Sequence, residues 1–251
     1  FNPSDSKQYF STVYYNYNHL TWFEFYGTST TFIKFLAFPL VNYLGFTYEA
    51  MMVLFSFFGF MGFGYLYILF RENIKFKHEV FGFDLLTIFM FLPNLHFWSA
   101  SLGKGSVVFL GIGMFFFGLN KIKSRLLYLF IGGFIIYHVR PHIMLVILVA
   151  SMVGLLLSTR NISIAAKLLF LSIAAVAFFY IYKDVFTMVG IDEEEFLTQG
   201  LDLTHRASEL TKATSGIDIT NYSLPEQVFA FLFRPLFFDA PGLLGLIVSF
   251  E

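Results

Sequence analysis

Long apolar runs separated by short polar segments dominate this chain of 251 residues. An α-helix needs about 17–25 residues to cross the hydrocarbon core of a bilayer. Runs close to that length predict membrane spans at 49–70, 82–100, 105–120, 124–139, 142–158 and 165–183, with another beginning near residue 240. The pattern therefore predicts an all-α fold, a polytopic bundle of transmembrane helices.

Basic residues in the short connections give this bundle an orientation, because Lys and Arg concentrate in cytoplasmic loops. Three connections carry them and together hold eight of the sixteen basic residues: Arg71, Lys75 and Lys77; Lys121, Lys123 and Arg125; and Arg160 with Lys167. Two spans separate each of these loops from the next, so all three can lie inside. The turns 101–105 and 140–142 and the acidic segment 184–239 are then predicted to be extracytoplasmic.

The ends of the chain complete the predicted organisation. Residues 1–30 form an extracytoplasmic or interfacial segment, 31–183 the helix bundle, 184–239 one long extracytoplasmic loop, and 240–251 the start of a truncated span. The apolar stretch 31–45 is either a full span or an interfacial helix, and its shortness favours the interfacial helix. We also expect a helix over 193–212, and we interpret both ends as cuts in a longer protein.

Composition agrees with a membrane protein. Hydrophobic residues make up 57% of the chain, and charged residues only 13%, whereas soluble proteins have about 25%. Glycines recur within the apolar runs, where small residues let helices approach closely, although glycine is also simply frequent in such helices. Cysteine is absent, which excludes disulfides and thiolate chemistry. No basic surface of the kind that binds nucleic acid is present.

Two polar clusters interrupt the apolar pattern. The first, 93–105, begins with Pro93, which is expected to break the helix, and continues through His96 to Lys104. The second is the turn His138-Val139-Arg140-Pro141-His142, in which Arg140 offers a planar fork for phosphate or carboxylate and the histidines can move protons. The alternative is a kinked helix and a turn that contact lipid headgroups.

Further cations are predicted on the same outer side. They are Arg206 in the acidic loop and Arg234 in Phe233-Arg234-Pro235, while Asp5 is a candidate acid or base if the N-terminal segment also lies outside. This accumulation opposes the positive-inside tendency, so orientation does not explain it. Convergent cations at a membrane surface suit an anionic lipid-linked ligand such as a polyprenyl pyrophosphate.

At these positions the sequence resembles bacterial O-antigen and exopolysaccharide polymerases, which are related to lipid-dependent glycosyltransferases. The likeness lies in the P-x-x-x-F-W-x-x-x-x-x-K run from Pro93 to Lys104, in Arg140-Pro141-His142, and in Phe233-Arg234-Pro235. Asp5-x-x-x-Tyr9 is similar to an acidic motif in the first outer loop of the related transferases.

The resemblance implies glycosyl transfer at the outer face of the bacterial inner membrane. A polyprenyl-pyrophosphate-linked glycan would be the donor, with membrane lipids and protein subunits as further contacts. Substrate-binding roles would fall to His96, Lys104, Arg140, Arg206 and Arg234, and a catalytic base role to His142 or Asp5. The scheme needs neither a metal nor a cofactor. A structural subunit of a membrane complex and a transporter of anionic solutes remain the alternatives.

Overall fold

The computed structural model describes residues 5–16, 18–76, 78–157 and 164–189, together with positions 223, 226 and 229. The chain divides into two compact units, Phe1–Val185 and Phe186–Glu251, and the described elements belong to the first unit except for the end of the last helix. This part of the chain is mostly helical, as the sequence predicts. The elements before the first long helix are α1 (Asp5–Tyr15), the 3-10 helix η1 (Trp22–Phe25) and α2 (Thr30–Asn42). The later elements are α3 (Tyr48–Asn73), β1 (Glu79–Val80), β2 (Phe83–Asp84), α4 (Leu85–Met90), α5 (Pro93–Ser99), α6 (Lys104–Asn120), α7 (Ile122–Val139), α8 (Pro141–Leu157) and α9 (Ile164–Val189).

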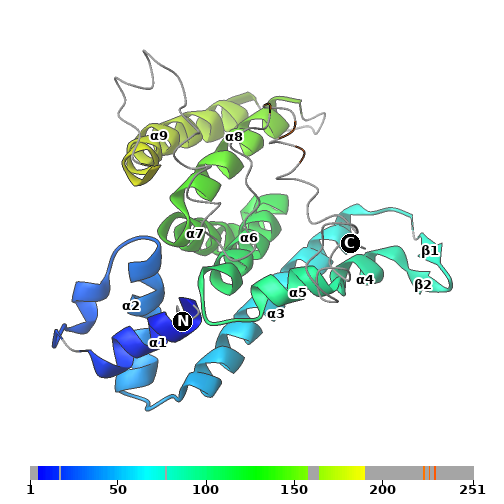
Figure 1. Cartoon of the computed structure of the whole chain (residues 1–251). Coiled ribbons are helices and arrows are strands. Elements are labelled where there is room, and N and C mark those ends of the chain that lie inside the picture. Colours follow the sequence, from blue (N-terminus) through cyan, green and yellow to red (C-terminus); the bar gives the residue numbers. More distant parts are fainter. Residues whose placement is uncertain are drawn as a thin grey trace. The chain divides into compact units, whose positions relative to one another are not determined.

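Three helices form the centre of this unit: α6 packs against α3 on one side and against α7 on the other (Figure 1). The start of α6 adjoins the start of α3, where the Leu102 N–H lies 3.3 Å from the Met52 sulfur. At the opposite end, the Asn120 amide donates to the Glu72 carboxylate at 3.0 Å. Helices α3 and α6 therefore run parallel, and the short link between α6 and α7 makes α7 antiparallel to both.

Glycines create the close approach between these helices. A Cβ atom on Gly62 would lie 2.9 Å from the carbonyl oxygen of Phe109, and one on Gly113 would lie 2.7 Å from the carbonyl oxygen of Gly62. Between α6 and α7, a Cβ on Gly132 would meet the backbone of Gly111. These glycines pack helix backbone against helix backbone, as small residues do between membrane helices.

The predicted span at 82–100 is not one continuous helix. The chain forms a short β-hairpin, then α4, and a new helix starts at Pro93. Pro93 cannot donate a backbone hydrogen bond, so it stands in the first turn of α5 rather than inside a longer helix. The prediction of a helix break at Pro93 is confirmed, and the prediction of a single helix across 82–100 is wrong.

The N-terminal segment folds into helices that pack on one another and on α7. Helix α1 contacts α2, and α2 contacts η1 and α7. With 13 residues, α2 is about 20 Å long, which is shorter than the roughly 30 Å of a hydrocarbon core. Its length fits the interfacial helix that the sequence favours better than a full span.

Among the described residues, two helices are long and apolar enough to cross a membrane, α3 and α7. In their most apolar windows only 22% and 28% of the residues are buried inside the structure. The core helix of a soluble protein would be mostly covered, so this exposed apolar surface weakly favours contact with lipid. Helices α2, α6 and α8 are apolar but shorter. The six-span topology remains a prediction. The expected helix over 193–212 and the span near residue 240 lie outside the described residues.

Candidate functional site

A large cleft of about 980 Å³ lies where the starts of α1, α3 and α6 meet the end of α7. Its polar and charged lining comes from distant parts of the chain, with Asp5 and Ser6 on α1, Lys104 at the start of α6, and Arg140 between α7 and α8. The apolar wall consists of Met52, Leu95, Phe97, Trp98, Leu102, Val108 and Phe109. The cleft therefore combines charged groups with an aromatic surface.

A tight turn between α5 and α6 positions Lys104. The Ser106 hydroxyl donates to the carbonyl oxygens of Ser101 and Gly103, at 2.9 and 3.2 Å, and holds this turn against the first residues of α6. Leu102 is almost completely buried and anchors the turn from the other side. A side chain on Gly105 would collide with the carbonyl oxygen of Trp98, so this position accommodates only glycine.

Arg140 stands at the junction of two helices. Its N–H donates to the carbonyl oxygen of Ile136 at 2.8 Å and closes α7, while its own carbonyl oxygen accepts from Ile143 and Met144 in the first turn of α8. Pro141 provides the fixed φ that suits the first position of a helix. The backbone of Arg140 is thus hydrogen-bonded on both sides, and the residue lines the cleft from this junction.

Helix α1 contributes the carboxylate. Asp5 and Tyr9 are four residues apart and lie on one face of α1, and both line the cleft. The side chain of Thr30 on α2 lies near the buried Tyr9 phenol and favours its charged form. Ser6 and the Tyr48 hydroxyl lie 3.0 Å apart, a hydrogen bond that ties α1 to the start of α3. These contacts fix helix α1, which begins with Asp5, against α2 and α3.

The charged groups of the cleft influence one another. Burial and the nearby charge of Asp5 raise the pKa of the Tyr9 phenol, and the charge of Arg140 partly offsets this rise. Lys104 immediately precedes the span predicted at 105–120. Burial lowers the pKa of its ammonium group, the positive charge of Arg140 lowers it further, and Asp5 opposes the change. Asp5, Lys104 and Arg140 therefore act as one electrostatic group.

Neither cation is neutralised by an ion pair in the part of the chain that the structure describes. The ion pairs found there join Arg71 to Asp84 and Glu72 to Lys121 and Arg125, all away from the cleft. Two cations that form no ion pair with any described residue, facing one cavity, can bind an anion with several oxygens, such as a phosphate or pyrophosphate. The aromatic wall can hold the apolar part of such a ligand.

The structure brings together three of the predicted site residues, Asp5, Lys104 and Arg140. His96 and His142 are not among the side chains that line the cleft. Arg206 and Arg234 lie outside the described residues, so the structure shows nothing about their proximity to the other cations.

Two histidines of the predicted clusters instead form contacts within the fold. The Nε2 atom of His96 donates to the carbonyl oxygen of Met90 at 2.8 Å, and its ring stacks on Phe63. His138 is buried, with Nδ1 donating to the carbonyl oxygen of Phe134 at 2.9 Å and Nε2 lying 2.8 Å from the Tyr26 hydroxyl. Because a carbonyl oxygen only accepts, a neutral His138 carries its proton on Nδ1 and accepts from Tyr26.

Sequence reasoning missed several contributors to the cleft, among them Ser6 and Met52. Ser6 follows Asp5 in the first turn of α1, and Met52 lies in the first turns of α3, where the apolar pattern gave no signal. Ser6 could have been predicted, since a helix beginning at Asp5 places both residues at its N-terminal end. The approach of α3 could be found only from the fold.

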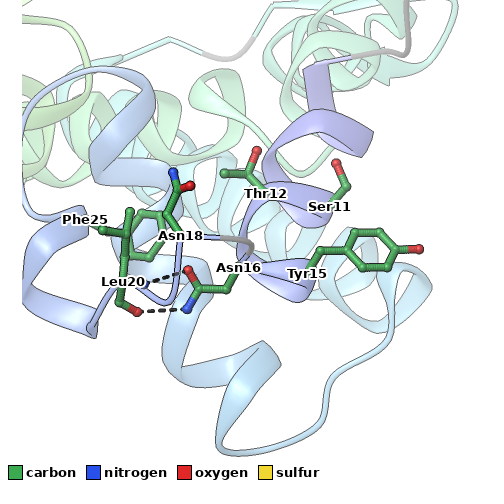
Figure 2. A pocket seen from close by; sticks show the side chains of 7 residues that line it. All are labelled: Ser11, Thr12, Tyr15, Asn16, Asn18, Leu20 and Phe25. Atoms are coloured by element: carbon green, nitrogen blue, oxygen red, sulfur yellow. Dashed lines mark hydrogen bonds between the residues drawn. The ribbon is translucent and has the colours of Figure 1, made fainter.

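A second, smaller pocket of about 190 Å³ lies at the other end of α1 and is lined by uncharged side chains (Figure 2). Several of its polar side chains already form hydrogen bonds within the protein. The Asn16 amide donates to the Leu20 carbonyl oxygen at 2.8 Å and accepts from the Leu20 N–H at 3.0 Å, as the dashed lines in Figure 2 show. The hydroxyls of Ser11 and Thr12 donate to the carbonyl oxygen of Gln8. The cleft is the stronger candidate site.

Within the described residues, no three His, Asp or Glu side chains come together in a group that could hold a metal ion. A scan against protein-family models gives no match for this chain. Searches of curated proteins and of solved structures give no significant match either.

Proposed function

We propose that this chain is a membrane glycosyltransferase of the polysaccharide-polymerase type that binds a polyprenyl-pyrophosphate-linked glycan in the cleft. The observation that carries the proposal is the pairing of Lys104 and Arg140, two cations without ion-pair partners among the described residues, in one cavity with the carboxylate of Asp5. The residues come from three distant segments of the chain.

Each part of the cleft has a role in such a transfer. An acceptor hydroxyl attacks the anomeric carbon of the donor sugar, a new carbon–oxygen bond forms, and the bond to the pyrophosphate breaks. The pyrophosphate leaves with the bonding electrons, so its negative charge grows in the transition state. Lys104 and Arg140 stabilise that charge, which is the largest single contribution that such a site can make.

We assign the role of base to Asp5 rather than His142. Asp5 lines the same cavity as the two cations, whereas His142 is not part of the lining. As the transfer proceeds, the carboxylate takes the proton of the acceptor hydroxyl. The aromatic wall formed by Phe97, Trp98 and Phe109 supports either the sugar rings or the first units of the polyprenyl chain.

The proposal is tested by measuring binding and glycan extension with the same variants. Binding of a short-chain polyprenyl pyrophosphate to the purified chain is expected to weaken on the order of tenfold or more in Arg140→Ala, because a charge-assisted hydrogen bond is lost. Lys104→Ala is expected to have a similar effect. Asp5→Asn is expected to leave binding nearly intact and to stop glycan extension.

Lys123→Ala is the matched control, because Lys123 is an exposed cation in the first turn of α7, at the opposite end of that helix from the cleft. The control should bind and extend like the wild type. Wild-type affinity together with wild-type glycan lengths in both Arg140→Ala and Lys104→Ala would refute the proposal.

A further inference from the structure

An aromatic hairpin lies at the end of α3 that is remote from the cleft. Strands β1 and β2 pair antiparallel, with Glu79 opposite Asp84 and Val80 opposite Phe83. The two residues of the turn, Phe81 and Gly82, have φ angles of 53° and 80°. Two positive φ angles are typical of a type I′ turn, which favours Asn or Asp before the glycine. Phenylalanine at the first position is unfavourable, so its presence needs an explanation other than turn propensity.

The base of the hairpin is firmly held. One oxygen of the Asp84 carboxylate accepts from Arg71 at 2.8 Å and from the Thr87 hydroxyl at 3.1 Å, and it caps α4 through the Thr87 N–H. The Leu85 N–H donates to the carbonyl oxygen of His78 at 2.8 Å. The hairpin is therefore fixed to the end of α3, and it extends away from that helix (Figure 1).

The hairpin and the link before it present large apolar side chains that the described part of the chain does not cover. Phe81 is 96% exposed, Phe76 is 74% exposed and Phe83 is 67% exposed. Exposing three phenylalanines to water is strongly unfavourable, and a fully exposed one on a strained backbone is more so. Burial of these side chains in an apolar environment would offset the cost of their exposure and of the strained turn.

This exposed surface continues from α3. Large apolar side chains along that helix are exposed, among them Phe57, Phe60 and Phe70, and the exposure continues through Ile74 into the hairpin. Behind the hairpin lies a cavity of about 270 Å³ whose walls are mainly apolar side chains of α3 and α4. The same solvent that covers α3 would thus also cover the hairpin. Because α3 is long and apolar enough to span a bilayer, lipid is the solvent that suits this apolar surface.

We propose that the hairpin Glu79–Asp84 inserts its aromatic tip into the bilayer leaflet at this end of α3. Phospholipid acyl chains cover Phe76, Phe81 and Phe83 and enter the apolar cavity behind them. The charged base stays at headgroup level, where Asp84 is neutralised by Arg71. The hairpin then acts as an interfacial anchor that fixes the depth of α3. This proposal requires α3 to lie in a bilayer but does not depend on glycosyl transfer.

Spin labelling tests the proposal directly, because the sequence has no cysteine and each introduced thiol is unique. The variant Phe81→Cys carries a nitroxide in the purified chain, reconstituted in vesicles of phosphatidylcholine and phosphatidylglycerol. Collision with oxygen reports lipid, and collision with a water-soluble nickel chelate reports water. The oxygen-to-nickel ratio at position 81 is expected to exceed that at Glu79→Cys several-fold.

Two further labels make the result decisive. Phe60→Cys, in the middle of α3, should show the high ratio of a lipid-facing site, and Phe83→Cys should agree with position 81. If the oxygen-to-nickel ratio is high at position 60 but the ratios at positions 81 and 83 match that at position 79, the tip lies in water and the proposal is wrong. A low ratio at position 60 would overturn it as well, since α3 would then not face lipid. Glycan extension enters none of these outcomes.

Discussion

Glu72 at the end of α3 accepts two hydrogen bonds from the guanidinium of Arg125 at the start of α7, at 2.8 and 2.6 Å. The same carboxylate accepts from Lys121 at 3.0 Å. The guanidinium of Arg125 also lies over the ring of Phe117, with its central carbon 3.7 Å from the ring centroid. Two of the basic connections that the sequence predicts to be cytoplasmic are thus joined at one end of the three central helices, and the cleft lies at the other end.

This arrangement predicts how the chain is oriented in a membrane. In inside-out vesicles, Lys75→Cys and Lys123→Cys should react with an impermeant maleimide, whereas Glu49→Cys near the start of α3 should not. Right-side-out vesicles should give the opposite pattern. All three native side chains are exposed, so the labels should not disturb packing. Reaction of positions 75 and 49 from the same side would contradict the orientation.

The glycine contacts predict a sharp difference between two neighbouring positions of α3. Gly62→Ala should destabilise the protein by about 1–3 kcal/mol, because the added methyl group collides with the backbone of Phe109 and forces α3 and α6 apart. Thermal unfolding in detergent micelles measures this effect.

Gly64→Ala is the matched control on the same helix. A Cβ atom at Gly64 would meet nothing within 4 Å, so this substitution should be neutral, or stabilising through the higher helix propensity of alanine. Equal melting temperatures for the two variants would show that the close approach of α3 to α6 does not contribute to stability.

The helices were largely predictable from sequence, and the tertiary contacts were not. Apolar runs of helical length located α3, α6, α7 and α8, because burial or lipid contact over a whole helix leaves a continuous signal. At 82–100 the same apolar signal gave a wrong prediction of one continuous helix, since short helices and an exposed hairpin are as apolar as a span.

The candidate site could be predicted only in part. Lys104 and Arg140 stood out as cations beside apolar runs, and their common cavity agrees with a shared role. His138 and His142 flank Arg140 and look equivalent in the sequence, because the sequence alone does not show whether an imidazole is buried. Packing decides the difference: His138 is buried against Phe134 and Tyr26. Nothing in the pattern of residues indicated that Tyr26 would reach His138.

The Tyr26–His138 hydrogen bond predicts a structural role for this histidine. Tyr26→Phe leaves Nε2 of a buried imidazole without its partner and should destabilise the protein by about 1 kcal/mol. The backbone contact from Ser29 N–H to the His138 carbonyl oxygen remains, so the fold should persist. The exposed Tyr43→Phe is the control and should unfold like the wild type. Loss of polyprenyl pyrophosphate binding in Tyr26→Phe, without a change in stability, would instead point to a role in the site.

Anion binding in the cleft is expected to depend on pH through Lys104. Burial and the charge of Arg140 lower the pKa of this lysine, so the free protein loses the positive charge at a lower pH than an ordinary lysine would. A bound anion favours the charged form, so binding takes up a proton once the pH exceeds this lowered pKa. Affinity for a short-chain polyprenyl pyrophosphate should therefore decline from neutral to alkaline pH. Lys104→Arg should flatten that decline, because a guanidinium stays charged over this range. Lys7→Arg on the exposed face of α1 is the control and should keep the wild-type profile. Titration calorimetry in detergent measures the profiles, and an unchanged decline in Lys104→Arg would exclude Lys104 as the titrating group.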